Sequence, residues 1–460
     1  MRQITWLAVT GQIPYGAPVR CGTKYYMIGV TLLFSVYLFM TASVPYSVAA
    51  DPLEDWLNKA MEQNQQIIAA RQAWEAAKER APQARSFDDP MVGVEFMRMD
   101  STRFDDYDTT EVMVSQRLPW FGKRRARIDT ADRGAEVAGF RYLEKRRDVR
   151  ARLTTAYWQL WVAQRAVEIN RENLELLTQF EKIARARYEA GQGLQADVLR
   201  AQVERDRLET DLLTMKQDLE VAQARINRLL SEPVQTPREV STTPAVPELP
   251  GMLTELYDRA TTYNSMLRSM SRMIDAREAA VRSARLNYAP NFELRVMARQ
   301  HDGQSGFQEY DTGVAINIPW LWRGKYDARV REARAELDQA DAQYQDMVDR
   351  TFLNVREFHA SADAGLRTVR LFEDVILPRT REFLDSTRAA YESGRVTLLE
   401  LINAQRAWED THLAYERTRA RYGADVAKLE EITQPWTEHE IESGLISPER
   451  TDNEDTTHER

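Results

Sequence analysis

The second half of the chain repeats the plan of the first at an offset of about 200 residues, and this duplication limits the possible folds more than any other feature. The order and the spacing of the matches persist along nearly the whole chain. A period this long indicates two copies of one large unit and excludes a solenoid of short repeats. The matched segments are Asn64–Ile67 with Asn264–Leu267, Leu118–Phe121 with Ile318–Leu321, Tyr188–Gly191 with Tyr391–Gly394, and Asp197–Leu199 with Glu400–Ile402.

Each half has the same predicted order of elements: a helix, two short strands, a very long helix and a final helix. The opening helices are expected at 53–85 and 253–287. The first repeat, 51–232, has strands at about 91–99 and 110–118, a long helix at 122–190 and a final helix at 195–231. The second repeat, 251–433, has strands at about 291–300 and 310–318, a long helix at 323–393 and a final helix at 397–432. The proline-rich segment 233–250 is an irregular linker between the repeats.

An apolar segment that begins at Met27 predicts an export signal. Basic residues precede it, and Val48-Ala49-Ala50 offers small residues at the positions that signal peptidase reads, so residues 1–50 are expected to be removed. The alternative is a single N-terminal membrane anchor. The single cysteine, Cys21, would be lost with the signal. The exported chain would then have neither a thiolate metal ligand nor a cysteine for a lipid anchor.

The predicted strands carry the argument for a membrane. In 292–299, Phe, Leu, Val and Ala alternate with Glu, Arg and Met, and 311–318 alternates in a similar way. Alternation with a period of two gives a strand one apolar face and one polar face, as a bilayer β-barrel requires. Trp120, Trp320 and Trp322 stand where strands end, as expected of aromatic residues at a membrane interface. The alternative is a pair of half-buried soluble hairpins packed on the helices.

Four strands are too few to close a membrane barrel, because about eight is the smallest number observed. An open sheet edge in hydrocarbon would leave backbone hydrogen-bonding groups without partners. If the strands lie in a membrane, the chain must therefore associate with copies of itself. Two copies would supply eight strands and three copies would supply twelve.

The two long helices do not fit a compact domain. Residues 122–190 contain no proline, and as one helix they would extend roughly 100 Å. A leucine or valine recurs at every seventh position from Leu153 to Leu174, which is typical of a coiled coil. In the second long helix, Gly365 and Pro378 are expected to introduce bends. A narrow apolar seam between polar faces favours the wall of a tube, whereas a solid helical bundle would need wider apolar stripes.

These features resemble the outer-membrane efflux proteins of the TolC type. The resemblance covers about residues 53–433 and is carried by the duplicated plan and by the turn segments Tyr188–Leu199 and Tyr391–Ile402. It implies a mostly α-helical fold with a membrane β-barrel, in which a homotrimer in outer-membrane lipid forms a twelve-stranded barrel over a long periplasmic helical tube. It also implies a periplasmic adaptor (membrane fusion protein) and an inner-membrane RND-type pump as partners. The Pro119–Arg124 run looks like the branch that exports heavy-metal cations.

The resemblance also assigns roles to the two turns between helices. In the family these turns form the periplasmic tip, where the tube narrows and meets the adaptor. The residues that match the adaptor-contact turns are Gly191, Gly193, Leu194 and Gly394, and those that match the gate are Asp197, Glu400, Asn403 and Arg395. Asn403 stands where the family often has a second acidic gate residue, which indicates that this second gate ring is weakened or absent. The alternative for all of these residues is ordinary turn and capping chemistry.

The sequence does not indicate an enzyme, a cofactor, a resident metal site or a nucleic-acid partner. The five histidines do not pair at metal-ligand spacing, and phosphate-loop and nucleophile-elbow motifs are absent. The acidic tail, 434–460, is expected to be disordered. We therefore predict an outer-membrane channel with a large periplasmic portion, which serves a tripartite efflux system as a passive exit duct gated at its periplasmic tip. The alternative is a periplasmic coiled-coil adaptor or scaffold protein.

Overall fold

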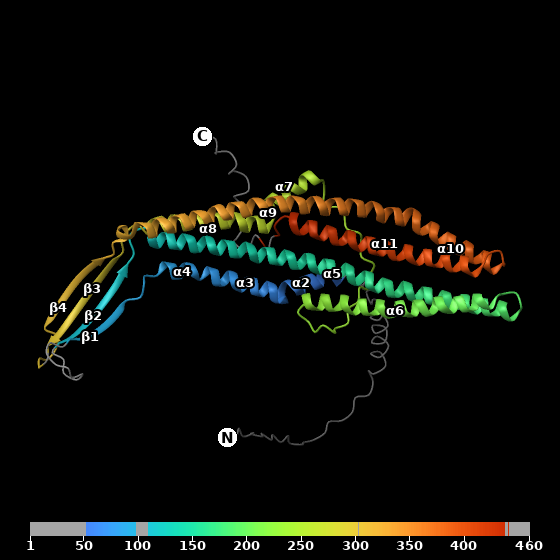
Figure 1. Ribbon diagram of the computed structural model, residues 1–460, viewed down its shortest axis with the longest axis horizontal. Coiled ribbons are helices and arrows are strands. Elements are labelled where there is room, and N and C mark those ends of the chain that lie inside the picture. Colours follow the sequence, from blue (N-terminus) through green and yellow to red (C-terminus); the bar gives the residue numbers. More distant parts are fainter. Residues whose placement is uncertain (1–51, 98–108, 302, 438–439, 441–460) are drawn as a thin grey trace, which may run out of the picture. The chain divides into compact units, whose positions relative to one another are not determined.

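The computed structural model describes residues 52–97, 109–301, 303–437 and 440 (Figure 1). The predicted signal at 1–50 and most of the acidic tail lie outside these residues, as do Arg98 and Met99 at the end of the first predicted strand. All described residues belong to one structural unit of the chain, Asp51–Arg460. Within the described ranges, no helix combines the length and the apolar character needed to cross a membrane.

Two copies of one arrangement make up this unit, which confirms the duplicated plan. The first copy consists of α2 (Pro52–Gln63), α3 (Gln65–Lys78), α4 (Arg80–Arg85), β1 (Met91–Met97), β2 (Thr109–Leu118), α5 (Lys123–Glu189) and α6 (Gln195–Leu229). The second consists of α7 (Leu253–Tyr263), α8 (Ser265–Leu286), β3 (Phe292–His301), β4 (Glu309–Ile316), the 3-10 helix η1 (Pro319–Trp322), α9 (Arg323–Leu371), the π-helical turn η2 (Phe372–Ile376), α10 (Leu377–Glu392) and α11 (Leu398–Thr433).

Each opening helix is interrupted, so the prediction of continuous helices at 53–85 and 253–287 was wrong. Both are interrupted at equivalent asparagines, Asn64 and Asn264, whose backbones are extended, with ψ at 122° and 116°, and the first is interrupted again at Glu79. Asn64 Oδ1 accepts a hydrogen bond from Gln66 N at 2.9 Å, and Asn264 Oδ1 accepts one from Leu267 N at 2.9 Å. A short amide side chain can begin a new helix in this way because it satisfies the free N–H groups of the first turn.

The second long helix contains one irregular turn, η2, directly before Pro378. In η2 the N–H of Leu377 donates to the carbonyl of Phe372, which is the wider spacing of a π-helix. Pro378 has no N–H, and the wider turn accommodates its ring without ending the helix. Gly365 has a packing role. A Cβ at Gly365 would lie 3.4 Å from Tyr422 Cβ, so the glycine permits close contact between α9 and α11.

The four strands form one antiparallel sheet in the order β1-β2-β3-β4, which makes β1 and β4 the edge strands. The register places Val92, Val114 and Val296 in one row across three strands, and most of the branched and aromatic apolar residues of the strands share their face. This apolar face is exposed. The side chains that are 45–70% exposed on it are Val92, Val94, Phe96, Val114, Val296, Val314 and Ile316.

The opposite face of the sheet carries charged residues and methionines. Arg299 Nε lies 2.7 Å from Glu111 Oε2, and Arg299 Nη1 lies 2.8 Å from Asp311 Oδ2. One guanidinium therefore joins β2, β3 and β4. Met113 and Met297 are paired directly across β2 and β3 on the same face. The sheet thus separates an apolar surface from a charged one.

The long helices form two hairpins, α5 with α6 and α10 with α11, whose turns lie side by side in Figure 1. Helix α5 alone has 67 residues. Near the turns, one apolar cluster contains Phe180 of α5, Leu208 of α6, Leu384 of α10 and Leu401 of α11. This packing brings together segments that lie about 200 residues apart in the chain. The cluster places both turns at the same end of the helices.

Candidate functional site

Helix α5 ends in a glycine turn that reverses the chain into α6. Gly191 has φ 72°, a left-handed conformation that glycine adopts without strain. Its N–H donates to Tyr188 O at 2.9 Å, and the N–H of Gln192 donates to Arg187 O at 2.8 Å. These two bonds satisfy free carbonyl groups of the last helical turn in a Schellman motif.

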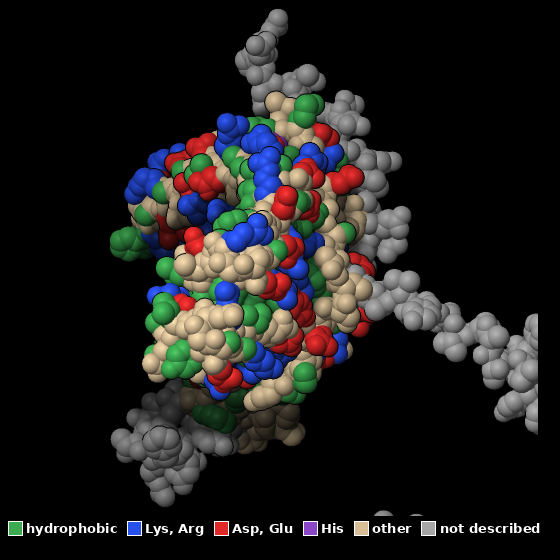
Figure 2. Space-filling model, turned by 90° about the vertical axis from the view of Figure 1, so that its right-hand side faces the viewer, with side chains coloured by type: hydrophobic (Ala, Val, Ile, Leu, Met, Phe, Trp, Pro, Cys, Tyr) green, Lys and Arg blue, Asp and Glu red, His purple; other side chains and the backbone are tan. Residues whose placement is uncertain are grey.

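The turn from α10 into α11 repeats this geometry. Gly394 has φ 74°, its N–H donates to Tyr391 O at 2.9 Å, and the N–H of Arg395 donates to Ala390 O at 2.9 Å. Figure 2 views the end of the unit that carries both turns, where basic and acidic side chains are interspersed with hydrophobic ones. The duplicated sequence therefore produces two turns of the same type at one end of the hairpins.

The start of α6 is tightly packed on one side and apolar on the other. A Cβ at Gly193 would lie 3.2 Å from both Arg187 Cβ and Tyr188 N, so a larger residue would displace the end of α5. Leu194 caps α6 with its backbone only, and its side chain is exposed together with Leu199 and Val203. Three neighbouring exposed apolar side chains on the first turns of a helix form a small surface suited to a partner.

Arg187, which the sequence did not single out, links the two turns. Its Nη1 donates to Tyr391 O at 2.8 Å, and its guanidinium lies 5.1 Å from the centre of the Tyr391 ring. The contact stabilises the end of α10, because a cation interacts favourably with the free carbonyl groups there. The only local signal in the sequence is a basic residue in the last turn before a glycine stop. Which carbonyl that residue binds depends on how the other hairpin packs.

Asp197 lies in the first turn of α6, where a carboxylate interacts favourably with the helix dipole. Its side chain is 25% exposed, and its Oδ1 lies 3.7 Å from Arg200 Nη1. Asp197 also acts on the other hairpin. Burial raises the pKa of the Tyr391 phenol, Arg187 opposes that rise, and the charge of Asp197 adds to it. Asp197, Arg187 and Tyr391 therefore form one group between the hairpins, which we call the tip cluster.

The other three residues assigned to the gate make local contacts or are exposed. Glu400 completes a capping box, in which Thr397 N donates to Glu400 Oε2 at 2.7 Å and Glu400 N donates to Thr397 Oγ1 at 3.4 Å. Arg395 Nε donates to Ser393 Oγ at 2.9 Å, and Asn403 is exposed. Glu400 thus has a capping role within its own chain.

A seam of polar side chains lies along the contact between the hairpins. This polar seam consists of Asn170, Asn173, Glu204, Gln405, Arg406, Glu409 and His412. Arg406 Nε donates to Glu204 Oε1 at 2.7 Å, and Gln405 donates to Asn173. Several buried atoms have no hydrogen-bond partner among the described residues, namely both amide atoms of Asn170, Asn173 Nδ2, Gln405 Oε1 and His412 Nδ1. Each such atom costs about 1–3 kcal/mol, so the seam holds the hairpins together less firmly than an apolar contact would.

Glu409 is the acidic residue of the seam that titrates near neutral pH. Burial, with Asp410 adding to the effect and Arg207 opposing it, raises the pKa of Glu409 to about 7. Its carboxyl group faces Asp211 and Glu204 of α6 as well, and both raise its pKa further. The charge across the seam therefore changes near pH 7.

The three tryptophans assigned to a membrane interface lie between the sheet and the long helices. Trp120 stacks on Phe292 with ring centres 5.3 Å apart, and Trp320 and Trp322 are exposed. Lys123 Nζ donates to Ala289 O at 2.6 Å, which fixes the first turn of α5 against the segment leading into β3. Trp120 extends the apolar face of the sheet to its end, because Phe292 belongs to that face.

Comparison with known proteins adds an independent observation. The model of the family described as "Outer membrane efflux protein" matches residues 56–232 and 256–433. The cobalt-zinc-cadmium resistance protein CzcC of Cupriavidus metallidurans is 24% identical over 80% of this chain and 86% of CzcC. The outer membrane protein TolC of Vibrio cholerae is 20% identical over 88% of this chain and 96% of TolC. Among solved structures, CusC superposes with a TM-score of 0.72 at 15% identity, covering 84% of this chain and 92% of CusC.

Proposed function

Because the chain belongs to the outer membrane efflux protein family, and is therefore the outer-membrane channel of an efflux pump, we propose that it works as a passive exit duct gated at its periplasmic tip. In this proposal the sheet lies in the outer membrane, the helices extend into the periplasm, and residues 1–50 direct export. The energy for transport comes from a pump in the inner membrane. The chain itself carries out no reaction.

The observation that carries this proposal is the exposed apolar face of the sheet. Seven of its side chains are 45–70% exposed, and leaving apolar surface in water is unfavourable by about 25 cal/mol per Å². The other face holds the ion pairs of Arg299, which suit a water-filled lumen. A sheet with these two faces fits a wall between lipid and water.

We propose that three copies complete the barrel. Each copy supplies four strands with β1 and β4 at the edges, and an open edge is not tolerated in hydrocarbon. Pairing β4 of one copy with β1 of the next removes every edge and gives twelve strands. On the helices, Leu353, Leu371 and Phe383 are large apolar side chains that remain exposed and would be covered by neighbouring copies.

The gate is proposed at the tip cluster. There Arg187 joins the two hairpins of one chain through Tyr391, and Asp197 places a carboxylate beside this link. Opening would separate the hairpins at this cluster, where three copies bring three Asp197 carboxylates together. Arg395, Glu400 and Asn403 are proposed to line the same opening.

The proposed partners are a periplasmic adaptor and an inner-membrane RND-type pump. The adaptor would contact the turns at Gly191, Gly193, Leu194 and Gly394, where the exposed apolar residues of α6 begin.

Heavy-metal cations are the proposed cargo. This is supported by the relative CzcC, which is named for cobalt-zinc-cadmium resistance, and by the carboxylates on the charged face of the sheet. In the described parts of the chain no cluster of three His, Cys, Asp or Glu residues suits a metal ion. An adaptor or scaffold is not favoured, because the efflux family model matches both halves of the chain.

The proposal is tested by conductance in a planar lipid bilayer. Wild-type protein should insert and conduct, and Asp197→Ala should give a larger conductance, or one less sensitive to cations in the bath, because it removes charge from the constriction. Asp218→Ala, which removes an exposed carboxylate elsewhere on α6, is the matched control and should behave as wild type. An unchanged Asp197→Ala channel would exclude this residue from the gate, and protein that never conducts would exclude a duct.

A further inference from the structure

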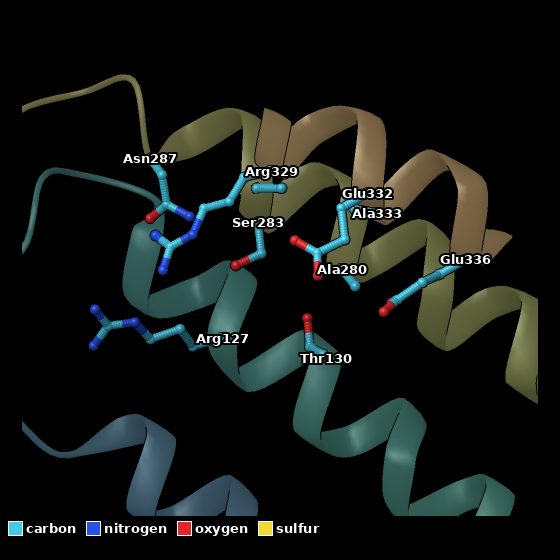
Figure 3. A pocket seen from close by; sticks show the side chains of 10 residues that line it. Arg127, Thr130, Ala280, Ser283, Asn287, Arg329, Glu332, Ala333 and Glu336 are labelled. Carbon is cyan, nitrogen blue, oxygen red and sulfur yellow. The ribbon is translucent and has the colours of Figure 1, made fainter. Parts of the chain in front are cut away.

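A cleft of about 360 Å³ lies among α5, α8 and α9, close to where the long helices leave the sheet (Figure 3). Its floor is made of small residues of α8, Ala280, Ser283 and Ala284, which leave room between the two flanking helices. Longer polar side chains from α5 and α9 form the walls. The cleft belongs neither to the tip cluster nor to the polar seam.

Two arginines at equivalent positions of the two repeats stand at one end of the cleft. Arg127 follows the Gly122-Lys123 pair by four residues, and Arg329 follows Gly324-Lys325 by the same number. Figure 3 shows both guanidinium groups at the end of the cleft where Asn287 lies. Arg127 has Asp88 at 3.8 Å, but a long ion pair between exposed groups contributes little. Two guanidinium groups therefore lie at this end of the cleft, and the one ion pair of Arg127 compensates its charge only weakly.

The first turns of α5 and α9 increase this positive charge. Neither first turn contains an acidic residue, although acidic residues are the ones that a helix N-terminus favours. Basic residues occupy both turns instead, and burial, together with the charge of Arg127, lowers the pKa of Lys123. An anion bound at this end of the cleft would interact favourably both with the side chains and with the helix dipoles.

The opposite end of the cleft is acidic. Glu332 and Glu336 line it, and in Figure 3 both carboxylates point into the space on the other side of Ser283 from the guanidinium groups. Arg277 Nη1 binds Glu336 at 2.6 Å. Thr130 Oγ1 donates to Ala126 O at 2.9 Å, which leaves its lone pairs available to a donor. The cleft therefore offers donors at one end and acceptors at the other.

We propose that this cleft binds a zwitterion with a phosphate group and a primary ammonium group, the headgroup chemistry of an aminophospholipid. The phosphate oxygens would accept hydrogen bonds from Arg127 and Arg329, and the ammonium group would donate to Glu332 and Thr130. A ligand with both charges matches the basic end and the acidic end of the cleft, whereas a simple anion would be repelled by the carboxylates at the acidic end.

The position of the cleft suits a lipid headgroup. Arg127 follows Trp120 by seven residues and Arg329 follows Trp322 by seven, which is about 10 Å along a helix. This argument rests on the proposed placement of the sheet in the membrane, with the tryptophans at its interface. A soluble phosphoethanolamine compound has the same chemistry, and the experiment separates the two sources.

The test uses the full chain purified in detergent, in three forms: wild type, the double variant R127Q/R329Q, and the control R125Q/R331Q, which removes exposed cations from the same two helices outside the cleft. One arm titrates O-phosphoethanolamine and measures thermal stability. The other arm incubates the protein with vesicles of phosphatidylcholine alone, or containing phosphatidylethanolamine or phosphatidylglycerol, and measures by mass spectrometry the lipid retained after detergent exchange. We expect selective retention of phosphatidylethanolamine, weakened about tenfold or more in R127Q/R329Q and unchanged in the control.

The variant Glu332→Gln should weaken the retention of phosphatidylethanolamine, because it removes the acceptor of the ammonium group. Stabilisation by O-phosphoethanolamine without lipid retention would support the cleft with a soluble ligand. Equal retention of all three lipids together with no response to O-phosphoethanolamine, or equal losses in the control, would overturn the proposal. Protein that forms no channel would contradict the proposed function alone, since the detergent titration tests the cleft without a membrane.

Discussion

At the scale of single residues, the contacts between the hairpins depend on side chains that are distant in the sequence. Arg187 binds the carbonyl of Tyr391 across 204 positions of the chain. The glycine turns, in contrast, are held by hydrogen bonds between residues at most five positions apart at the end of one helix. Local chemistry therefore builds each turn, and Arg187 joins one turn to the other.

Replacing Arg187 by glutamine is expected to loosen the tip cluster. Glutamine is too short to retain the bond to Tyr391 O, and it loses the cation over the ring, which is worth about 0.5–1 kcal/mol at an exposed site. Single channels of Arg187→Gln in a planar bilayer should spend more time open than wild-type channels. The control Arg171→Gln changes an exposed arginine of the same helix and should leave gating unchanged. Unaltered gating in Arg187→Gln would remove this residue from the proposed mechanism.

The conformation of Gly191 can be tested against a glycine of the same helix. Neither Gly191 nor Gly134 would place a Cβ within 4 Å of another group, so the two differ in backbone conformation rather than in packing. Gly191→Ala should destabilise the protein by about 1–2 kcal/mol, because φ is 72° there. Gly134→Ala, inside α5, should stabilise it by about 0.5–1 kcal/mol. Denaturant unfolding of both variants measures the two effects, and equal signs would contradict this account.

At the scale of elements, helix ends and helix contacts are decided by polar side chains. Asn64 and Asn264 end one helix and begin the next in both repeats, and the π-helical turn η2 accommodates Pro378 within one long helix. Between the hairpins, the polar seam adds buried polar side chains to a contact that also contains the apolar cluster of Phe180, Leu208, Leu384 and Leu401. A contact with unpaired buried polar atoms is easier to separate than a fully apolar one, which is compatible with the proposed separation of the hairpins during gating.

The seam predicts a dependence of stability on pH. The pKa of Glu409 is about 7 in the folded chain, above its ordinary value of 4.5, so the folded state binds the proton more tightly. The stabilisation of the folded state by protonation of Glu409 is fully present below about pH 4.5, and it is lost as the pH rises through about 7. Glu409→Gln should therefore flatten the loss of thermal stability between about pH 5 and pH 8. Burial raises the pKa of Glu431 to about 7 as well, so part of the slope should remain in Glu409→Gln. The exposed Glu382→Gln serves as the control, and a slope undiminished in Glu409→Gln would assign the dependence to other groups.

At the scale of the whole molecule, the chain is one part of a larger assembly. Its sheet has an exposed apolar face and two edge strands, and its helices keep large apolar side chains in contact with solvent. Each feature is unfavourable in an isolated soluble chain and is relieved by lipid and by neighbouring copies. The resemblance to TolC-type proteins is confirmed by the family match and by the fold.

The two faces of the sheet are distinguished by placing the same residue on each. Val94→Lys puts a charge on the apolar face and should reduce insertion into the membrane, because a lysine near the bilayer midplane costs about 2–4 kcal/mol. Glu95→Lys, at the next position, puts the charge on the opposite face and should leave insertion intact. Membrane fractionation followed by detergent extraction gives the yield of inserted protein. Equal yields from the two variants would contradict the assignment of the faces.

The sequence by itself determined the features that repeat locally. The period-two alternation predicted the strands and their two faces, the seven-residue spacing predicted the long helices, and the glycines at 191 and 394 predicted the turns. Each depends on backbone conformation and on neighbours within a few residues, which a sequence shows directly. The mostly helical, duplicated fold was confirmed, whereas the roles of Asp197, Glu400, Asn403 and Arg395 stay predictions.

Only the tertiary structure decided which segments meet. It paired β2 with β3, placed Arg187 on Tyr391, gathered the polar seam from three helices, and brought Arg127 and Arg329 to one cleft. It also placed Glu400 in a capping box, which the pattern of residues left open as an alternative. The physical reason is that these contacts join positions about 170 to 230 residues apart, and their geometry depends on how whole helices and strands pack.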